Sequence, residues 1–230
     1  MTTLIGVPCY DGRLHFAVVE AIGRAGLARR MVRYQQNSIL TKCFNMLWCE
    51  ALNARANGVT HFAMVHADVM PDPGWLDRMH DIMEEHKADV LSVAMPLKSK
   101  HGLTSTAVND DPPRRFTLRQ LHAGPETFTA PNLLVNTGLM LVDFRKPWVE
   151  TIAFRFDDKI LNTGDGFVAV NLPEDWAFSF DASSRGARIC VTRAIGATHF
   201  GIDGFRNDEP WGTMAVDEFN GAAVLDAGTM

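Results

Sequence analysis

The sequence predicts an α/β fold in which a mostly parallel sheet is flanked by helices. Apolar runs that suit buried strands alternate with amphipathic stretches through the first 96 residues, in the order strand, helix, strand, helix, strand, helix, strand. Polar residues and turn signals follow these apolar runs directly, as they do where parallel strands end. The composition, with 47% hydrophobic and 21% charged residues, suits a globular protein with a sizeable core.

The apolar runs define the first half of the predicted sheet, with strands at residues 4–7, 28–34, 62–65 and 90–94. The longest predicted helix follows Ser38, its expected N-cap, and ends at Asn57-Gly58. Another helix should open at Asp72-Pro73-Gly74, with Asp72 as N-cap and Pro73 at the first helical position.

From residue 97 the alternation stops. Residues 98–131 are polar and rich in turn residues, so we expect an irregular insertion without a clean helix. The remaining expected elements are an interrupted strand at 133–144, a turn cluster at 162–166, a helix from Glu174 to near Gly186, and a strand at 188–191. We expect one domain over residues 1–211 and a C-terminal tail over residues 212–230.

Charge and targeting signals narrow the class of protein. The net charge of −5 argues against a globally basic nucleic-acid binder, although a local basic patch stays possible. No basic segment precedes the first apolar run and no run is long enough to span a bilayer, so we expect neither a signal peptide nor a transmembrane segment. The four cysteines form no C-x-x-C pair, which favours reduced thiols in a cytoplasmic protein.

Three features carry candidate chemistry. His66 and Asp68 follow the third predicted strand, Glu174 and Asp175 begin a helix, and His199 follows a predicted edge strand. Each has a plain structural explanation, such as a favourable charge at a helix N-terminus or a buried histidine. Asp68 and His199 also offer oxygen and nitrogen ligands for Mn²⁺ or Mg²⁺, provided that diphosphate oxygens complete the shell.

The order of these features resembles that of the GT-A glycosyltransferases, and more closely the large inverting family 2 type that uses nucleotide-diphosphate sugars. The resemblance covers residues 4–201, and its individual motifs are short. It is carried by the strand and proline loop at Ile5-Gly6-Val7-Pro8-Cys9-Tyr10-Asp11, by Asn45 in the long helix, by His66-Ala67-Asp68 in the place of the D-x-D motif, by Glu174-Asp175 with Gly186 and the strand after it, and by His199.

This resemblance implies a role for each matching residue. The donor would be a nucleotide-diphosphate sugar, in the first instance a UDP-sugar, bound with Mn²⁺ or Mg²⁺ held by Asp68 and His199. Asp175 would be the catalytic base, with Glu174 as the alternative. The other implied donor contacts are Pro8, Tyr10, Asp11, Ser38, Lys42, Asn45 and His66, and the implied acceptor contacts are Asn136, Thr137, Gly138 and Trp176. One departure stands out: His66 replaces the first acid of D-x-D, which puts its usual nucleotide contact in question.

The acceptor stays open in the sequence. A glycan, a lipid-linked precursor, a small molecule and a hydroxylated base in DNA all fit. The insertion carries basic residues that suit either a solvated face or an anionic acceptor, namely Lys98, Lys100, His101, Arg114, Arg115, Arg119 and His122. Two other functions compete. A sugar nucleotidyltransferase would need a Gly-rich loop after the first strand, which Pro8-Cys9-Tyr10-Asp11-Gly12 lacks. A non-catalytic GT-A-like ligand-binding module is compatible with His66.

Overall fold

The computed structural model describes residues 1–27, 29–110 and 113–214. Its centre is a seven-stranded sheet in the order β2-β1-β3-β10-β5-β13-β8. β1 (Thr2–Cys9) pairs in parallel with β2 (Arg29–Gln36) and β3 (His61–Val65), and β5 (Val90–Val93) pairs in parallel with β13 (Ile189–Thr192). β10 (Leu139–Asp143) runs antiparallel between β3 and β5, and β8 (Thr127–Phe128) runs antiparallel along β13. The predicted mixed, mostly parallel sheet is confirmed.

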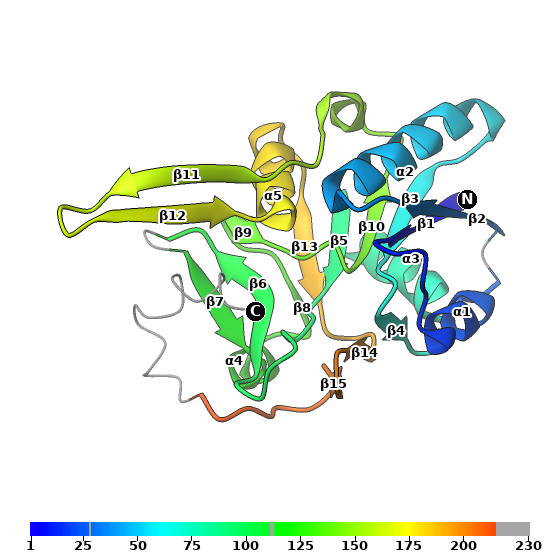
Figure 1. Ribbon diagram of the computed structural model, residues 1–230. Coiled ribbons are helices and arrows are strands. Elements are labelled where there is room, and N and C mark those ends of the chain that lie inside the picture. Colours follow the sequence, from blue (N-terminus) through cyan, green and yellow to red (C-terminus); the bar gives the residue numbers. More distant parts are fainter. Residues whose placement is uncertain (28, 111–112, 215–230) are drawn as a thin grey trace.

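Helices cover both faces of this sheet (Figure 1). α2 (Leu40–Ala54) and α5 (Glu174–Ser184) pack on one face, and α1 (Phe16–Gly23) and α3 (Trp75–Glu85) pack on the other. The side chains of β3 alternate between the two layers, as a strand buried on both faces requires. Phe62 and Met64 join the core under α2, whereas Ala63 and Val65 join the core under α1 and α3.

Trp48 anchors α2 on the sheet. Its side chain is 2% exposed, and its ring makes edge contacts with Phe62, Phe144 and Phe178. The indole N–H donates to the carbonyl of Val149 at 2.8 Å, so the polar end of the ring is satisfied. Truncating a buried aromatic side chain of this kind to alanine typically costs about 3–5 kcal/mol.

Both predicted N-caps are wrong. α2 begins after Ile39, and the side chain of Asn37 instead of Ser38 accepts a backbone hydrogen bond there, from the N–H of Ile39 at 3.0 Å. α3 begins after Gly74, which has a positive φ of 79°. Asp72 lies two residues before this N-cap position, and its N–H donates to the carbonyl of Gly196 at 2.9 Å. Its carboxylate pairs with Arg206 at 3.0 Å.

The expectation of an insertion without a helix is also wrong. Residues 98–131 contain β6 (Leu103–Val108), β7 (Arg114–Thr117) and the short helix α4 (Leu118–Ala123). β6 pairs with β7 and with β9 (Leu133–Leu134) in a three-stranded sheet. α4 starts with a capping box, in which the Thr117 side chain and the Gln120 side chain each satisfy the other residue's backbone N–H.

A three-stranded sheet and a two-stranded hairpin complete the architecture. β4 (Val69–Pro71), β14 (Ala197–Phe200) and β15 (Gly204–Arg206) form a small sheet beside the end of β3. β11 (Asp157–Asn162) and β12 (Phe167–Leu172) form a hairpin that projects from the body in Figure 1, and its turn is the cluster predicted at 162–166. The 3-10 helices η1 (Arg55–Asn57) and η2 (Pro147–Thr151) follow α2 and β10.

The expected tail begins in contact with the body. The N–H of Thr213 donates to the carbonyl of Lys100 at 3.2 Å, and residues 215–230 lie outside the described residues. Among the described helices, none is long and apolar enough to cross a membrane. All four cysteines are free thiols, and Cys9, Cys43 and Cys190 are buried.

Candidate functional site

A hollow of about 450 Å³ opens where β1 and β3 end. This is the edge of an α/β sheet where ligands usually bind. Five of the expected donor residues line this hollow, namely Pro8, Tyr10, Asp11, His66 and Asp68. The structure does not place the others there: Lys42 and Asn45 line a separate hollow on α2. Ser38 is exposed at the start of that helix.

Asp68 occupies the turn that joins β3 to the small sheet. Its backbone carbonyl accepts from the N–H of Phe200 at 2.8 Å, so the pairing of β4 with β14 fixes the turn. Its carboxylate oxygen Oδ2 forms an ion pair with Lys98 and lies 3.8 Å from Nε2 of His199. Burial alone raises the pKa of Asp68, but His66, His199 and Lys98 outweigh it and hold that pKa below its ordinary value.

His199 lies inside β14, where it pairs with Val69. Its Nδ1 lies 2.8 Å from the carbonyl of Pro96, and because a carbonyl oxygen only accepts, Nδ1 carries the proton. The neutral ring therefore presents an unprotonated Nε2 toward Asp68. Burial lowers the pKa of His199, which favours this neutral form. The structure thus brings together the two residues expected to bind metal.

His66 is half-buried between α2 and the segment before β10. Its ring lies 5.1 Å from the Phe44 ring, and its Nε2 lies 3.4 Å from the Thr137 hydroxyl. Burial lowers the pKa of His66 to about 4, so the ring is neutral at pH 7. Asn136 and Thr137, expected to meet the acceptor, are 5% and 1% exposed. The Asn136 amide donates to the carbonyl of Val93 and accepts from the N–H of Gly138, so Asn136 fixes the end of β5. Thr137 contacts His66 and positions its ring.

Glu174 and Asp175 begin α5 as predicted. Burial is the main cause that raises the pKa of Asp175 to about 7, and the neighbouring Glu174 carboxylate raises it further. The Arg115 guanidinium and the Trp176 N–H, which donates to Oδ1 at 2.8 Å, act against that rise. Burial also raises the pKa of Glu174. A carboxylate that titrates near neutral pH suits a general base.

Ser179 connects this helix to the sheet edge that holds His66. Its hydroxyl donates to the Asp175 carbonyl at 2.8 Å and accepts from the N–H of Val135 at 3.0 Å. The indole N–H of Trp176 donates to the carbonyl of Ser105 in β6 at 3.1 Å. The segment before β10 and the insertion therefore fix the position of α5.

Two residues that matter here were grouped in the sequence only with the other basic residues of the insertion. Lys98 was expected either on a solvated face or facing an anionic acceptor, but it contacts Asp68. Arg115 was expected in the same set, but its positive charge lowers the pKa of Asp175. The one available signal for Lys98 was its place just after Pro96, at the end of a predicted strand on the ligand-binding edge.

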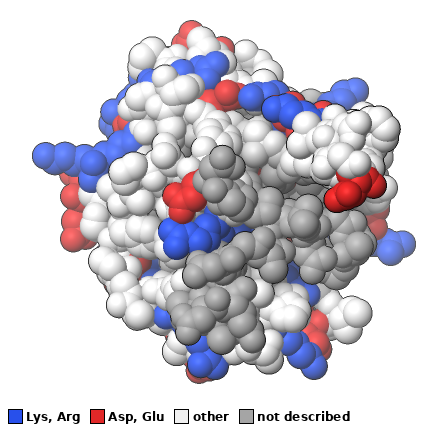
Figure 2. All heavy atoms as spheres, turned by 90° about the vertical axis from the view of Figure 1, so that its left-hand side faces the viewer, with Lys and Arg blue, Asp and Glu red and all other residues white. Residues whose placement is uncertain are grey.

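The insertion does not gather its basic residues into one patch. Arg114 pairs with Asp110, Arg119 donates to the Gly212 carbonyl, and His122 contacts the Asn207 carbonyl. Figure 2 shows Lys and Arg side chains interspersed with Asp and Glu over the face it presents. These described basic residues of the insertion are therefore held by separate partners.

The donor set for a metal ion is incomplete. Within the described residues, no three His, Cys, Asp or Glu side chains lie where they would hold one. Asp68 and His199 supply two ligands, and Lys98 already neutralises the Asp68 oxygen that faces His199. The histidine at position 66 has its Nε2 near Thr137. By themselves, these residues do not fit a resident Mn²⁺ or Mg²⁺ ion.

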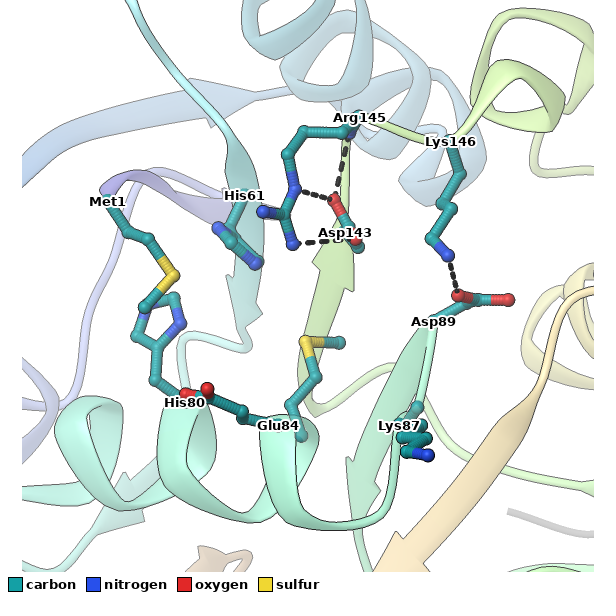
Figure 3. A pocket seen from close by; sticks show the side chains of 11 residues that line it. Met1, His61, His80, Glu84, Lys87, Asp89, Asp143, Arg145 and Lys146 are labelled. Carbon is teal, nitrogen blue, oxygen red and sulfur yellow. Dashed lines mark hydrogen bonds and ion pairs between the residues drawn. The ribbon is translucent and has the colours of Figure 1, made fainter.

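A second hollow, of about 420 Å³, lies at the opposite edge of the sheet, where β3 begins and β10 ends (Figure 3). Arg145 donates to Asp143 at 2.8 and 2.9 Å, and Lys146 pairs with Asp89 at 2.7 Å. The buried His61 also lines it. This second hollow shares no lining residue with the candidate donor hollow.

Known proteins were compared with the chain by sequence and by structure. No family model and no curated protein matches it. Among solved structures, A197 from STIV is similar, with 15% identity and a TM-score of 0.57 over 87% of this chain and 86% of that one. Residues 1–349 of S. aureus TarS, in complex with UDP-GlcNAc, are similar with 14% identity and a TM-score of 0.50, over 84% of this chain and 56% of that one.

The chain has a GT-A-like fold. Identities of 15% and 14% show the fold alone, so the resemblance to the inverting family 2 type stays a prediction. The chain spans only about half of the TarS structure that it matches.

Proposed function

We propose that this chain is a glycosyltransferase that moves a sugar from a nucleotide-diphosphate donor, in the first instance a UDP-sugar, to an acceptor hydroxyl. The observation that carries the proposal is the pairing of two features on one GT-A-like framework. One is the hollow at the ends of β1 and β3, with Asp68 at its rim. The other is the Asp175 carboxylate, whose raised pKa of about 7 suits a base.

In the proposed reaction, the donor base and ribose occupy the hollow beside Pro8, Tyr10 and Asp11. Asp175 accepts the proton of the acceptor hydroxyl as its oxygen forms a bond to the anomeric carbon. The bond from that carbon to the diphosphate breaks, and the nucleotide diphosphate leaves. Attack from the face opposite the leaving group inverts the anomeric configuration. Trp176, which was expected to contact the acceptor, is 6% exposed and donates its indole N–H to Ser105, so its proposed role is to hold the start of α5 and the base in place.

A resident metal ion is not part of this proposal. Asp68 and His199 are the residues that would contact one, but they supply only two ligands and Lys98 pairs with the carboxylate. Transfer of this kind needs a positive group beside the departing diphosphate, which leaves as an anion. The proposed transfer does not depend on which group supplies that charge.

The test is to incubate the protein with a panel of nucleotide sugars, UDP-GlcNAc first, and to measure both binding by calorimetry and release of the nucleotide diphosphate. Every donor is tested with Mn²⁺ and with a chelator. Asp175→Asn should retain donor binding and lose release by about 100-fold or more, the range of general-base catalysis. Asp165→Asn, in the exposed turn between β11 and β12, is the matched control. If no nucleotide sugar binds under either condition, the proposal is wrong.

The same assay separates the two competing functions. A non-catalytic ligand-binding module would bind a nucleotide sugar without releasing the diphosphate, and Asp175→Asn would change nothing. A sugar nucleotidyltransferase would release pyrophosphate from a nucleoside triphosphate and a sugar phosphate. The acceptor is then sought with glycans, lipid-linked precursors, small molecules and hydroxylated DNA, using the donor that binds.

A further inference from the structure

Lys98 contacts Asp68, one of the residues that line the candidate donor hollow. It follows β5 by way of Pro96, and its ammonium group pairs with Oδ2 of Asp68. Both side chains stay accessible, since Lys98 is 33% exposed and Asp68 37% exposed. A ligand in the hollow that Asp68 lines can therefore approach the same ammonium group.

The surroundings of Lys98 are shaped to hold its side chain. Gly201, in the turn after β14, faces the Lys98 stem, and a Cβ added there would lie 3.2 Å from Cδ and 3.4 Å from Cβ of Lys98. Any larger residue at position 201 would crowd the lysine. The carbonyl of Pro96 contacts His199, which keeps the start of the Lys98 loop against β14.

The two histidines around Asp68 have partners of their own. Nδ1 of His199 lies 2.8 Å from the Pro96 carbonyl, and Nε2 of His66 lies 3.4 Å from the Thr137 hydroxyl. Arg13 also lines the hollow, but it is exposed and lies 3.6 Å from Asp11. Among the described residues, Lys98 is thus the cation in direct contact with Asp68.

We propose that the Lys98 ammonium group, in place of a resident divalent ion, neutralises the diphosphate of the bound donor. Asp68 and His199 then act as positioning residues for that group. An ammonium has three N–H donors, so one can stay on Asp68 while the others bond phosphate oxygens. This inference rests on the proposed transfer function, but it concerns only the source of the positive charge.

The experiment uses UDP as the probe and calorimetry as the readout, in buffer with a chelator and in buffer with Mn²⁺. The wild-type protein should bind UDP in chelator with an affinity close to that in Mn²⁺. Lys98→Met should weaken UDP binding in chelator by about 10- to 100-fold, the range for losing a hydrogen bond to a charged group. Lys100→Met, at an exposed lysine of the same loop, is the control and should bind as the wild type does.

A second variant keeps the inference falsifiable should Lys98→Met fold poorly. Lys98→Arg keeps a positive charge at this position, so its UDP binding in chelator should stay within about threefold of the wild type, about 0.6 kcal/mol. A wild type that binds UDP in Mn²⁺ but not in chelator, or a Lys98→Met variant that binds UDP in chelator as tightly as the wild type does, overturns the inference. Either result leaves the proposed transfer standing. Absence of UDP binding in both buffers contradicts the proposed function itself.

Discussion

Arg115 lies over the face of Trp176, with its guanidinium carbon 4.4 Å from the ring centre. This contact joins β7 of the insertion to the start of α5, and it places a positive charge near Asp175. Such a stack of a guanidinium on an indole contributes about 0.5–2 kcal/mol. The pair therefore supports the position of the candidate base and also limits the rise of its pKa.

The first prediction concerns the pH dependence of transfer. Asp175 acts as a base only when it is ionised, and burial raises its pKa to about 7. The rate should therefore increase with pH through an apparent pKa near 7 and level off above it. Initial rates of nucleotide diphosphate release from pH 5 to pH 9 measure this curve. A rate that is flat from pH 5 to pH 7 would show that the base is another group.

The second prediction concerns two neighbours of Asp175 with opposite effects. The Arg115 charge lowers the pKa of Asp175, so Arg115→Met should raise it and move the rate curve to higher pH. The Glu174 charge raises that pKa, so Glu174→Gln should move the curve to lower pH. Arg114→Met, at an exposed arginine paired with Asp110, is the control and should leave the curve in place. Shifts in the same direction for both variants would contradict the assigned electrostatics.

The third prediction concerns Asn45, which the resemblance assigned to the donor. Its amide exchanges two hydrogen bonds with the backbone of Phe154, at 2.9 and 2.8 Å. Asn45→Ala should therefore lower the free energy of unfolding by about 2 kcal/mol, at about 1 kcal/mol for each bond. Urea unfolding measures this loss, with Asn53→Ala on the exposed side of the same helix as the control for helix propensity. UDP affinity should not change, and a large change would place Asn45 at the donor instead.

The sheet was predictable because its signals are local and repeated. The short apolar run within residues 61–65, all of which are buried, and the apolar stripe of α2 identify a buried strand next to a helix without knowledge of any distant contact. Because such signals are local, they also led to wrong N-caps for α2 and α3. Asp72 has the residue type of a cap, but its N–H bonds Gly196 and its carboxylate pairs with Arg206, both more than a hundred residues later in the chain. A sequence cannot show that competition.

The candidate site was predictable only in part, for a similar reason. Asp68 and His199 were both expected at the site, and the pairing of β4 with β14 brings them together. The charges that tune the site come from the insertion, whose short strands and six-residue helix leave weak periodic signals. The contacts of Lys98 with Asp68 and of Arg115 with Trp176 depend on how that insertion folds back on the sheet. They could not be read from spacing.

The fourth prediction concerns His66, which the resemblance places at the first acid of a D-x-D motif. His66→Asp would place a second carboxylate two residues before Asp68, and carboxylates are the preferred ligands of Mn²⁺. This variant should bind Mn²⁺ at least about tenfold more tightly than the wild type, a change of about 1.4 kcal/mol. Electron paramagnetic resonance of free Mn²⁺ measures it, and His66→Asn, which adds no charge, is the control. Equal Mn²⁺ binding by both variants would show that position 66 does not face the ion.

The last prediction concerns stability in acid, and it is independent of function. His61 is 2% exposed beside His80 in the hollow of Figure 3, and burial lowers its pKa from 6.5 to about 4. The folded state therefore resists a proton that the unfolded chain accepts. The contribution of His61 to the free energy of unfolding is fully present above pH 6.5 and is lost as the pH falls toward 4, by up to about 3 kcal/mol.

The variant that tests this is His61→Asn. Its amide should retain the bond that Nδ1 of His61 makes with the Thr60 hydroxyl, and it should flatten this part of the stability curve. Urea unfolding from pH 4 to pH 8 tests it, with His101→Asn at the exposed surface as the control. An unchanged slope in His61→Asn would show that other groups cause the acid sensitivity.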